Sequence, residues 1–177
     1  LLGSVFKSSK ASNLIPFWYD LVEIAKWCPT VHNLQPQKIK VISENRAELY
    51  YDPKRLLPHG DPKSVFSTVA MGVFIEHLSI AASKFDYDVK IEKVHSNIDI
   101  ESKGNTLFAT LALVKSQKEE SLDSSLIKKR RTSRTKYDEI SVDDSVLEEL
   151  KSEAELYENK FYYLSLIHIS EPTRHPL

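Results

Sequence analysis

The sequence predicts an α+β domain in which helices pack on a mainly antiparallel sheet. Three observations support this class: an amphipathic helical pattern, a pair of alternating strand patterns, and a long helical pattern followed by two more strands. The chain has 177 residues, of which 41% are hydrophobic and 10% aromatic. It is therefore long and apolar enough to bury the core of one domain.

The first helix is expected over residues 14–27, where apolar residues recur at helical spacing, and Pro29 stops it. Polar and apolar residues then alternate over 38–42, as in a half-buried strand. A turn at 44–46 and a second strand at 47–51 complete a predicted hairpin.

Residues 52–62 contain three prolines and a glycine, which predicts a loop. From Ser64 to Phe85 apolar residues recur every three or four positions, which predicts the longest helix and the one at the core. His77 lies on or beside its apolar face. We interpret it as a packed, hydrogen-bonded histidine in preference to a ligand.

Two more strands are expected at 87–94 and 106–114, separated by a polar loop. Residues 107–114 are apolar throughout, which is typical of a central strand covered on both faces.

A short helix is expected over 121–129, and an amphipathic helix over 143–156 with Asp143 or Asp144 as its cap. Residues 160–163 could begin one more strand.

The charges nearly cancel, because 24 Lys and Arg oppose 25 Asp and Glu. No global field draws the chain to nucleic acid or to a membrane surface, and no apolar run approaches the length of a membrane span.

Cys28 is the single cysteine, which suits a reducing compartment, so we expect a cytoplasmic protein. We interpret it as a small apolar residue that ends a helix. The histidines show no paired ligand spacing, so no metal site is expected.

Residues 28–37 separate two strongly patterned segments, and four of their side chains can donate hydrogen bonds: Thr30, His32, Asn33 and Gln35. Functional groups often lie on such loops because the flanking elements hold them rigidly. On the spacing alone, a ligand loop and a plain polar connection both stay open.

Residues 130–134 read Arg-Arg-Thr-Ser-Arg. The planar guanidinium group of an arginine can donate two hydrogen bonds to phosphate oxygens, and the Thr and Ser hydroxyls can donate further ones. This stretch therefore suits a phosphate. A solvated basic patch and a nuclear-import-like run are the alternatives. A nucleic-acid surface is disfavoured because no aromatic residues are interleaved.

Together the two motifs resemble those of the FMN-dependent nitroreductase family. Residues 28–37 are similar to the family's A-P-S-x-x-N-x-Q-P-W loop, and residues 130–134 to its arginine-rich phosphate motif, which Tyr137-Asp138 follows here. The motifs stand in the reverse of the usual order, which resembles the single-chain, two-lobed (Acg-like) branch. Asp61-Pro62 and the small residues of the helix at 64–85 also fit that branch.

The resemblance implies a nitroreductase-like fold with an FMN site between two halves of a pseudo-dimer. The FMN phosphate and ribityl chain would be bound by Arg130, Thr132 and Arg134. The isoalloxazine ring would lie against Pro29, Thr30, Val31 and Asn33, with Gln35 buttressing the loop. Gln37 stands where the family usually has Trp, which leaves the packing beneath the loop open.

The implied activity is that of an FMN-dependent oxidoreductase of nitroreductase type. NAD(P)H would give a hydride to FMN, and a small-molecule acceptor such as a nitroaromatic or a quinone would then take the electrons in a ping-pong cycle. No side chain is needed as nucleophile or base, so no catalytic residue is expected. One alternative is a catalytically silent protein of the two-lobed branch that binds or sequesters FMN, and another is an interaction module with a basic patch.

The expected organisation is an N-terminal lead (1–13), a first nitroreductase-like half (14–115), a linker and short helix (116–129), the truncated start of a second half (130–163) and an artefactual tail (164–177). The tail resembles a translated sequencing adapter, although a natural tail is the alternative. The missing C-terminal lobe, or a second copy, is expected to complete the site. Without it we expect weak flavin binding and an exposed apolar face on the helix at 64–85.

Overall fold

The computed structural model describes residues 16–116, 123–135 and 140–163, and it divides the chain into two compact units, Leu1–Arg131 and Thr132–Leu177. The first unit contains α1 (Pro16–Ala25), a 3-10 turn η1 (Val31–Asn33), β1 (Gln37–Ser43), β2 (Arg46–Tyr51), a 3-10 turn η2 (Pro53–Arg55), α2 (Val65–Ser83), β3 (Tyr87–Val94), β4 (Thr106–Lys115) and α3 (Ser125–Lys129). The second unit contains α4 (Asp144–Leu156). Several predictions lie outside the described residues: the lead, the start of the first helix, part of the linker and of the short helix, Tyr137-Asp138 and the tail.

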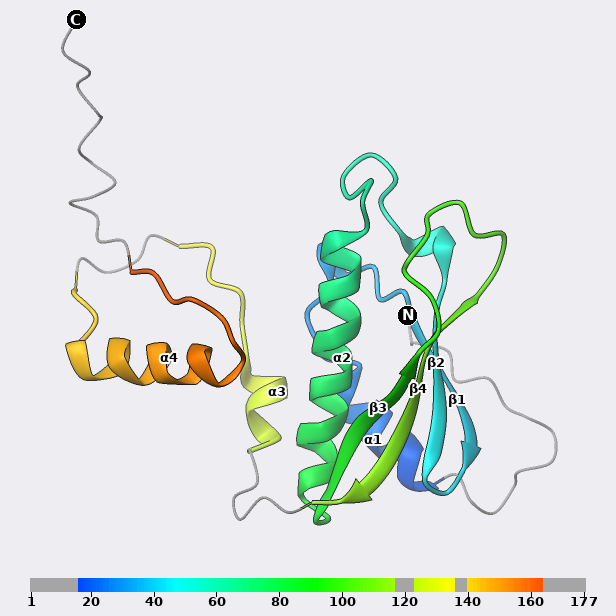
Figure 1. The fold of residues 1–177 in the computed structure, drawn as a ribbon, viewed down its shortest axis with the longest axis horizontal. Helices are drawn as coiled ribbons and strands as arrows, with labels where there is room; N and C mark the ends of the chain where they lie inside the picture. The colour runs from blue at the N-terminus through cyan, green and yellow to red at the C-terminus, as the bar shows by residue number, and fades with distance from the viewer. Residues whose placement is uncertain (1–15, 117–122, 136–139, 164–177) are drawn as a thin grey trace, which may run out of the picture. The chain divides into compact units, whose positions relative to one another are not determined.

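The sheet of the first unit has four strands in the order β1-β2-β4-β3, and each neighbouring pair is antiparallel (Figure 1). Ile39 is opposite Leu49, and Leu49 is opposite Ala109. β4 is an interior strand with buried residues at both alternating positions, Leu111 and Ala112, as predicted for a central strand. The α+β class with a mainly antiparallel sheet is therefore confirmed.

The core forms where α1 and α2 pack against each other and against the buried face of the sheet. Alternate residues of β1 point into it, so Ile39 and Val41 are buried while Lys38 and Lys40 are partly exposed. Trp18 of α1 is fully buried, and its indole Nε1 donates to the Glu44 carbonyl oxygen at 2.9 Å. This bond fixes α1 to the β1–β2 turn.

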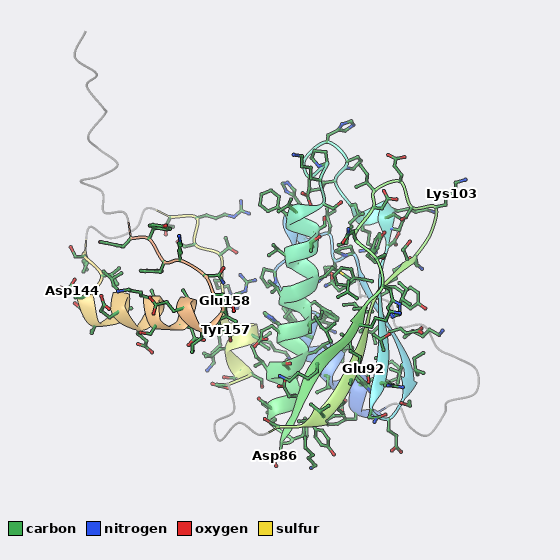
Figure 2. The ribbon with its side chains drawn as sticks, viewed as in Figure 1. Asp86, Glu92, Lys103, Asp144, Tyr157 and Glu158 are labelled. Atoms are coloured by element: carbon green, nitrogen blue, oxygen red, sulfur yellow. The ribbon has the colours of Figure 1, made fainter. Side chains whose placement is uncertain are left out.

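The long helix α2 was predicted at nearly its observed bounds. Eight of its residues are buried: Ser67, Ala70, Met71, Phe74, Ile75, Leu78, Ala81 and Ala82. Among the described residues α2 is also the one helix long and apolar enough to cross a membrane, so the expectation that no apolar run approaches that length is wrong. His77 is half-buried, with Nδ1 2.8 Å from the Val73 carbonyl oxygen, which agrees with the packed interpretation. The helix ends in a turn at Asp86, labelled in Figure 2, whose φ is 59° and whose carbonyl accepts from the Ser116 amide.

The second unit differs from expectation in two ways. The strand predicted at 160–163 is wrong, because the described part of this unit contains no strand with which it could pair. α4 follows Asp143 as predicted, but the Asp143 side chain makes no capping hydrogen bond, and α4 has no buried residue.

Candidate functional site

The segment between α1 and β1 has an unusual backbone. Three of its non-glycine residues have positive φ angles: His32 at 48°, Asn33 at 56° and Gln35 at 50°. For L-residues this region costs about 1–2 kcal/mol per residue, and such conformations persist only where the surroundings determine them. Contacts with neighbouring residues must therefore hold the loop in this conformation.

Residues of the motif itself provide part of this support. The Gln35 side chain donates from Nε2 to the Lys26 carbonyl oxygen at 3.0 Å, which ties the loop to the end of α1. The Gln35 amide donates to the Thr30 hydroxyl at 3.1 Å, and the Asn33 amide donates to the Thr30 carbonyl at 2.9 Å. Gln35 therefore joins the loop both to the end of α1 and to Thr30.

Further support comes from Arg55 in η2, which the sequence analysis did not single out. Its guanidinium donates to the Leu34 carbonyl oxygen at 3.0 Å, and its Nε lies 3.8 Å from a carboxylate oxygen of Asp52. Asp52 also pairs with Lys38 at 2.8 Å. Nothing in the sequence pattern marks Arg55, because the contact joins residues that are 21 positions apart.

The loop presents several side chains to solvent. Pro29 and Asn33 are exposed, whereas Thr30 and Val31 are partly exposed. Beside them is a shallow hollow between the loop, η2 and α2, lined by Thr30, Val31, Leu34, Pro36, Arg55, Ser67 and Ala70. All four predicted ring contacts, Pro29, Thr30, Val31 and Asn33, are thus at least partly accessible.

Beneath the loop, Cys28 and Gln37 are both buried. Burial raises the pKa of the Cys28 thiol to about 12, although the positive charge of Arg130 opposes this rise. Gln37 Nε2 lies 3.4 Å from Cys28 Sγ, while Gln37 Oε1 has no hydrogen-bond partner within the described part of the chain. Gln37 therefore fills the space beneath the loop at the cost of one unsatisfied buried oxygen.

The arginine motif begins on the first unit. α3 packs against α1 with Ile127 buried, and the Arg130 amide donates to the Leu126 carbonyl at 2.8 Å. Burial lowers the pKa of His77, and the charge of Arg130 lowers it further. Arg130 therefore acts electrostatically on both Cys28, at the start of the loop motif, and His77 of α2.

The rest of the motif, including Thr132 and Arg134, belongs to the second unit, where both residues are exposed. The structure thus brings the five predicted loop residues together and places Arg130 on the same unit. Within the described residues no group of three or more His, Cys, Asp or Glu side chains could hold a metal ion.

Comparison with solved structures shows a distant likeness. No protein-family model matches the chain, and no curated protein matches its sequence. Among solved structures, the chain is similar to a nitroreductase family protein from Clostridium difficile at 14% identity, with a TM-score of 0.45. The match covers 76% of this chain and 90% of that one. At this identity and TM-score the likeness does not assign the chain to a family.

Proposed function

We propose that the chain supplies part of the FMN site of an oxidoreductase of nitroreductase type. The observation that carries the proposal is the loop between α1 and β1. It holds three strained residues, His32, Asn33 and Gln35, by hydrogen bonds from Gln35 and Arg55, and it presents accessible side chains beside a hollow. Single residues with positive φ also occur at turns such as Asp86, but here three of them lie within residues 32–35, and backbone conformations of this kind cluster at active sites and ligand clamps.

The residues present fit FMN in chemistry. Pro29 and Val31 offer apolar surface to a flat ring, and Asn33 offers an exposed amide whose side chain has no partner among the described residues. Arg130 and Arg134 are both exposed guanidinium groups suited to a phosphate. Bound FMN would supply the hydride-accepting chemistry, with NAD(P)H as donor and a small nitroaromatic or quinone as acceptor.

The protein's part would be to bind and orient. Arg130, Thr132 and Arg134 would hold the phosphate and the ribityl chain, and the loop would fix the ring through Thr30 and Asn33. The buried thiol of Cys28, with its raised pKa, would stay protonated and take no part.

A second lobe or a second copy of the chain would complete this site. The first two turns of α2 expose three large apolar side chains, Val65 (55%), Phe66 (60%) and Val69 (59%). These residues, here called the α2 apolar face, lie on a helix whose opposite side is buried in the core. Clustered exposed apolar side chains are typical of an interaction surface.

The proposal is tested by FMN titration of the purified protein and of an Arg134→Ala variant. Loss of a charge-assisted phosphate contact should weaken FMN binding by about tenfold or more, since such hydrogen bonds contribute about 1.5–3 kcal/mol. Arg46→Ala is the matched control, because Arg46 pairs with Glu92 on the sheet. Equal FMN affinity in the Arg134→Ala variant and in wild type would contradict the proposed phosphate site.

Turnover separates the enzyme from a protein that only holds flavin. With FMN bound, NAD(P)H oxidation should accelerate on addition of menadione or a nitrofuran. Tight FMN binding without turnover would favour the sequestering alternative.

A further inference from the structure

The peptide unit between Leu34 and Gln35 is held at both ends. Its N–H, which belongs to Gln35, donates to the Thr30 hydroxyl at 3.1 Å, and its C=O, which belongs to Leu34, accepts from the Arg55 guanidinium at 3.0 Å. The orientation of this peptide plane determines the rotation about the N–Cα bond of Gln35. Two hydrogen bonds on opposite edges of this peptide unit thus hold its plane in the orientation that gives Gln35 a φ of 50°, which a glutamine does not adopt by preference.

Arg55 is itself held in place. It ends η2, where Pro53 fixes the first φ angle and the Asp52 carboxylate accepts from the Lys54 amide at 3.1 Å. The same carboxylate lies 3.8 Å from the Arg55 guanidinium and 2.8 Å from Lys38 Nζ. Burial raises the pKa of Asp52, but these hydrogen bonds and charges outweigh burial and lower it, so the carboxylate stays ionised beside Arg55.

The chain path reinforces this arrangement. The Asp52 amide donates to the Pro36 carbonyl oxygen at 2.9 Å, so the start of η2 is joined to the end of the loop. Arg55 also lines the hollow that Thr30 and Val31 share. Arg55 therefore both hydrogen-bonds to the loop backbone and lines the hollow beside the exposed face of the loop.

We propose that Arg55 is a positioning residue for the cofactor loop: its bond to the Leu34 carbonyl holds residues 30–35 in the conformation that presents Thr30, Val31 and Asn33 to the ligand. The ligand part of this inference rests on the proposed FMN site. The loop part stands on the hydrogen bonds alone.

Amide hydrogen exchange of the flavin-free protein tests the loop part. The amides of Asn33, Leu34 and Gln35 all donate within the loop, so their exchange reports its opening. In an Arg55→Gln variant their exchange should quicken by about tenfold, the factor expected when one charge-assisted hydrogen bond is lost. Arg46→Gln is the control, because it removes an arginine paired with Glu92 at the other end of β2. Equal exchange in the two variants would overturn the inference.

FMN titration of the same proteins tests the ligand part. Arg55→Gln should weaken FMN binding by about tenfold, and Arg55→Lys, which keeps the charge and one donor direction, should restore part of that loss. The urea midpoint of Arg55→Gln should move no further than that of Arg46→Gln, which separates positioning from general destabilisation. Weakened FMN binding with unchanged loop exchange would overturn the inference, because Arg55 would then act by touching the ligand. A wild-type protein that binds no FMN would contradict the proposed function, while hydrogen exchange would still decide whether Arg55 holds the loop.

Discussion

One carboxylate oxygen of Asp61 accepts two hydrogen bonds from Ser67, from its amide and from its hydroxyl, both at 2.8 Å. The other carboxylate oxygen accepts from the Phe66 amide at 3.3 Å. Asp61 is 4% exposed, so these bonds satisfy a buried charge at the first turn of α2. An acidic residue three positions before the cap residue Ser64 therefore does the capping.

Replacement of this carboxylate should destabilise the domain. We expect Asp61→Asn to lower the free energy of unfolding by about 1–3 kcal/mol, because the side-chain NH₂ group would replace one acceptor oxygen and leave a backbone N–H of Ser67 or Phe66 without an acceptor. Urea denaturation measures the loss. Asp99→Asn, which removes a carboxylate that accepts from the Glu101 amide at an exposed site, should cost far less. Similar losses in the two variants would contradict the capping role.

The same group predicts a pH dependence of stability. Burial raises the pKa of Asp61, but hydrogen bonds from the Ser67 amide and hydroxyl, and from the Phe66 and Val65 amides, outweigh it and lower the pKa. A lowered folded-state pKa contributes stability above the unfolded-state value and loses it as pH falls through the folded-state value. Urea midpoints taken at decreasing acidic pH should fall more steeply for wild type than for Asp61→Asn. Parallel pH profiles would count against this assignment.

Replacement of Gln37 should not lower the free energy of unfolding, in contrast to replacement of Asp61. The buried Oε1 of Gln37 has no partner among the described residues, so Gln37→Leu should leave the free energy of unfolding unchanged or raise it by about 1 kcal/mol. Gln35→Leu is the matched comparison, because it removes the bond to the Lys26 carbonyl and should cost about 0.5–1.5 kcal/mol. A clear loss of stability in Gln37→Leu would show that the oxygen is satisfied in solution.

Cys28 should be inert in the folded protein. Burial raises its pKa to about 12, so little thiolate exists near neutral pH. We expect a disulfide reagent such as DTNB to react with Cys28 only after denaturant is added. A Ser133→Cys variant provides the exposed control, because Ser133 is exposed and its thiol should react in the native state. Rapid native reaction of Cys28 would contradict the buried placement.

The α2 apolar face predicts association. Sedimentation velocity should show a larger species as the protein concentration rises, and Phe66→Glu or Val69→Glu should suppress it, because a charge would have to be buried on pairing. Ile42→Glu changes an exposed apolar residue of β1 and should leave association unaltered. Concentration-independent sedimentation of the wild type would remove the argument for a second copy.

Much of the first unit follows from sequence periodicity, and the rest does not for identifiable reasons. Alternation from Lys38 to Ile42 predicts β1 because one face is buried. Helical periodicity predicts α2, yet it cannot tell that Phe66 and Val69 face solvent while Met71 and Phe74 form the core. A strand at 160–163 fails because a strand needs a neighbour, which local pattern does not specify.

The candidate site also contains some residues that the sequence can predict and others that it cannot. Motif residues such as Thr30 and Gln35 can be predicted, because they lie within one short segment and bond to each other. Arg55 could not be, because its partner Leu34 is brought near by the β1–β2 hairpin, a tertiary effect. The positive φ of Gln35 also has no sequence mark, whereas Asn33 and His32 belong to the residue types that adopt this region more often than most.

The most direct test of the account is the visible absorption spectrum of the purified protein, recorded before and after addition of FMN and then of NAD(P)H. The account predicts a yellow protein that takes up FMN, more completely at higher protein concentration, and whose colour fades when NAD(P)H is added. A protein that stays colourless and takes up no added FMN at any concentration would contradict the proposed flavin site.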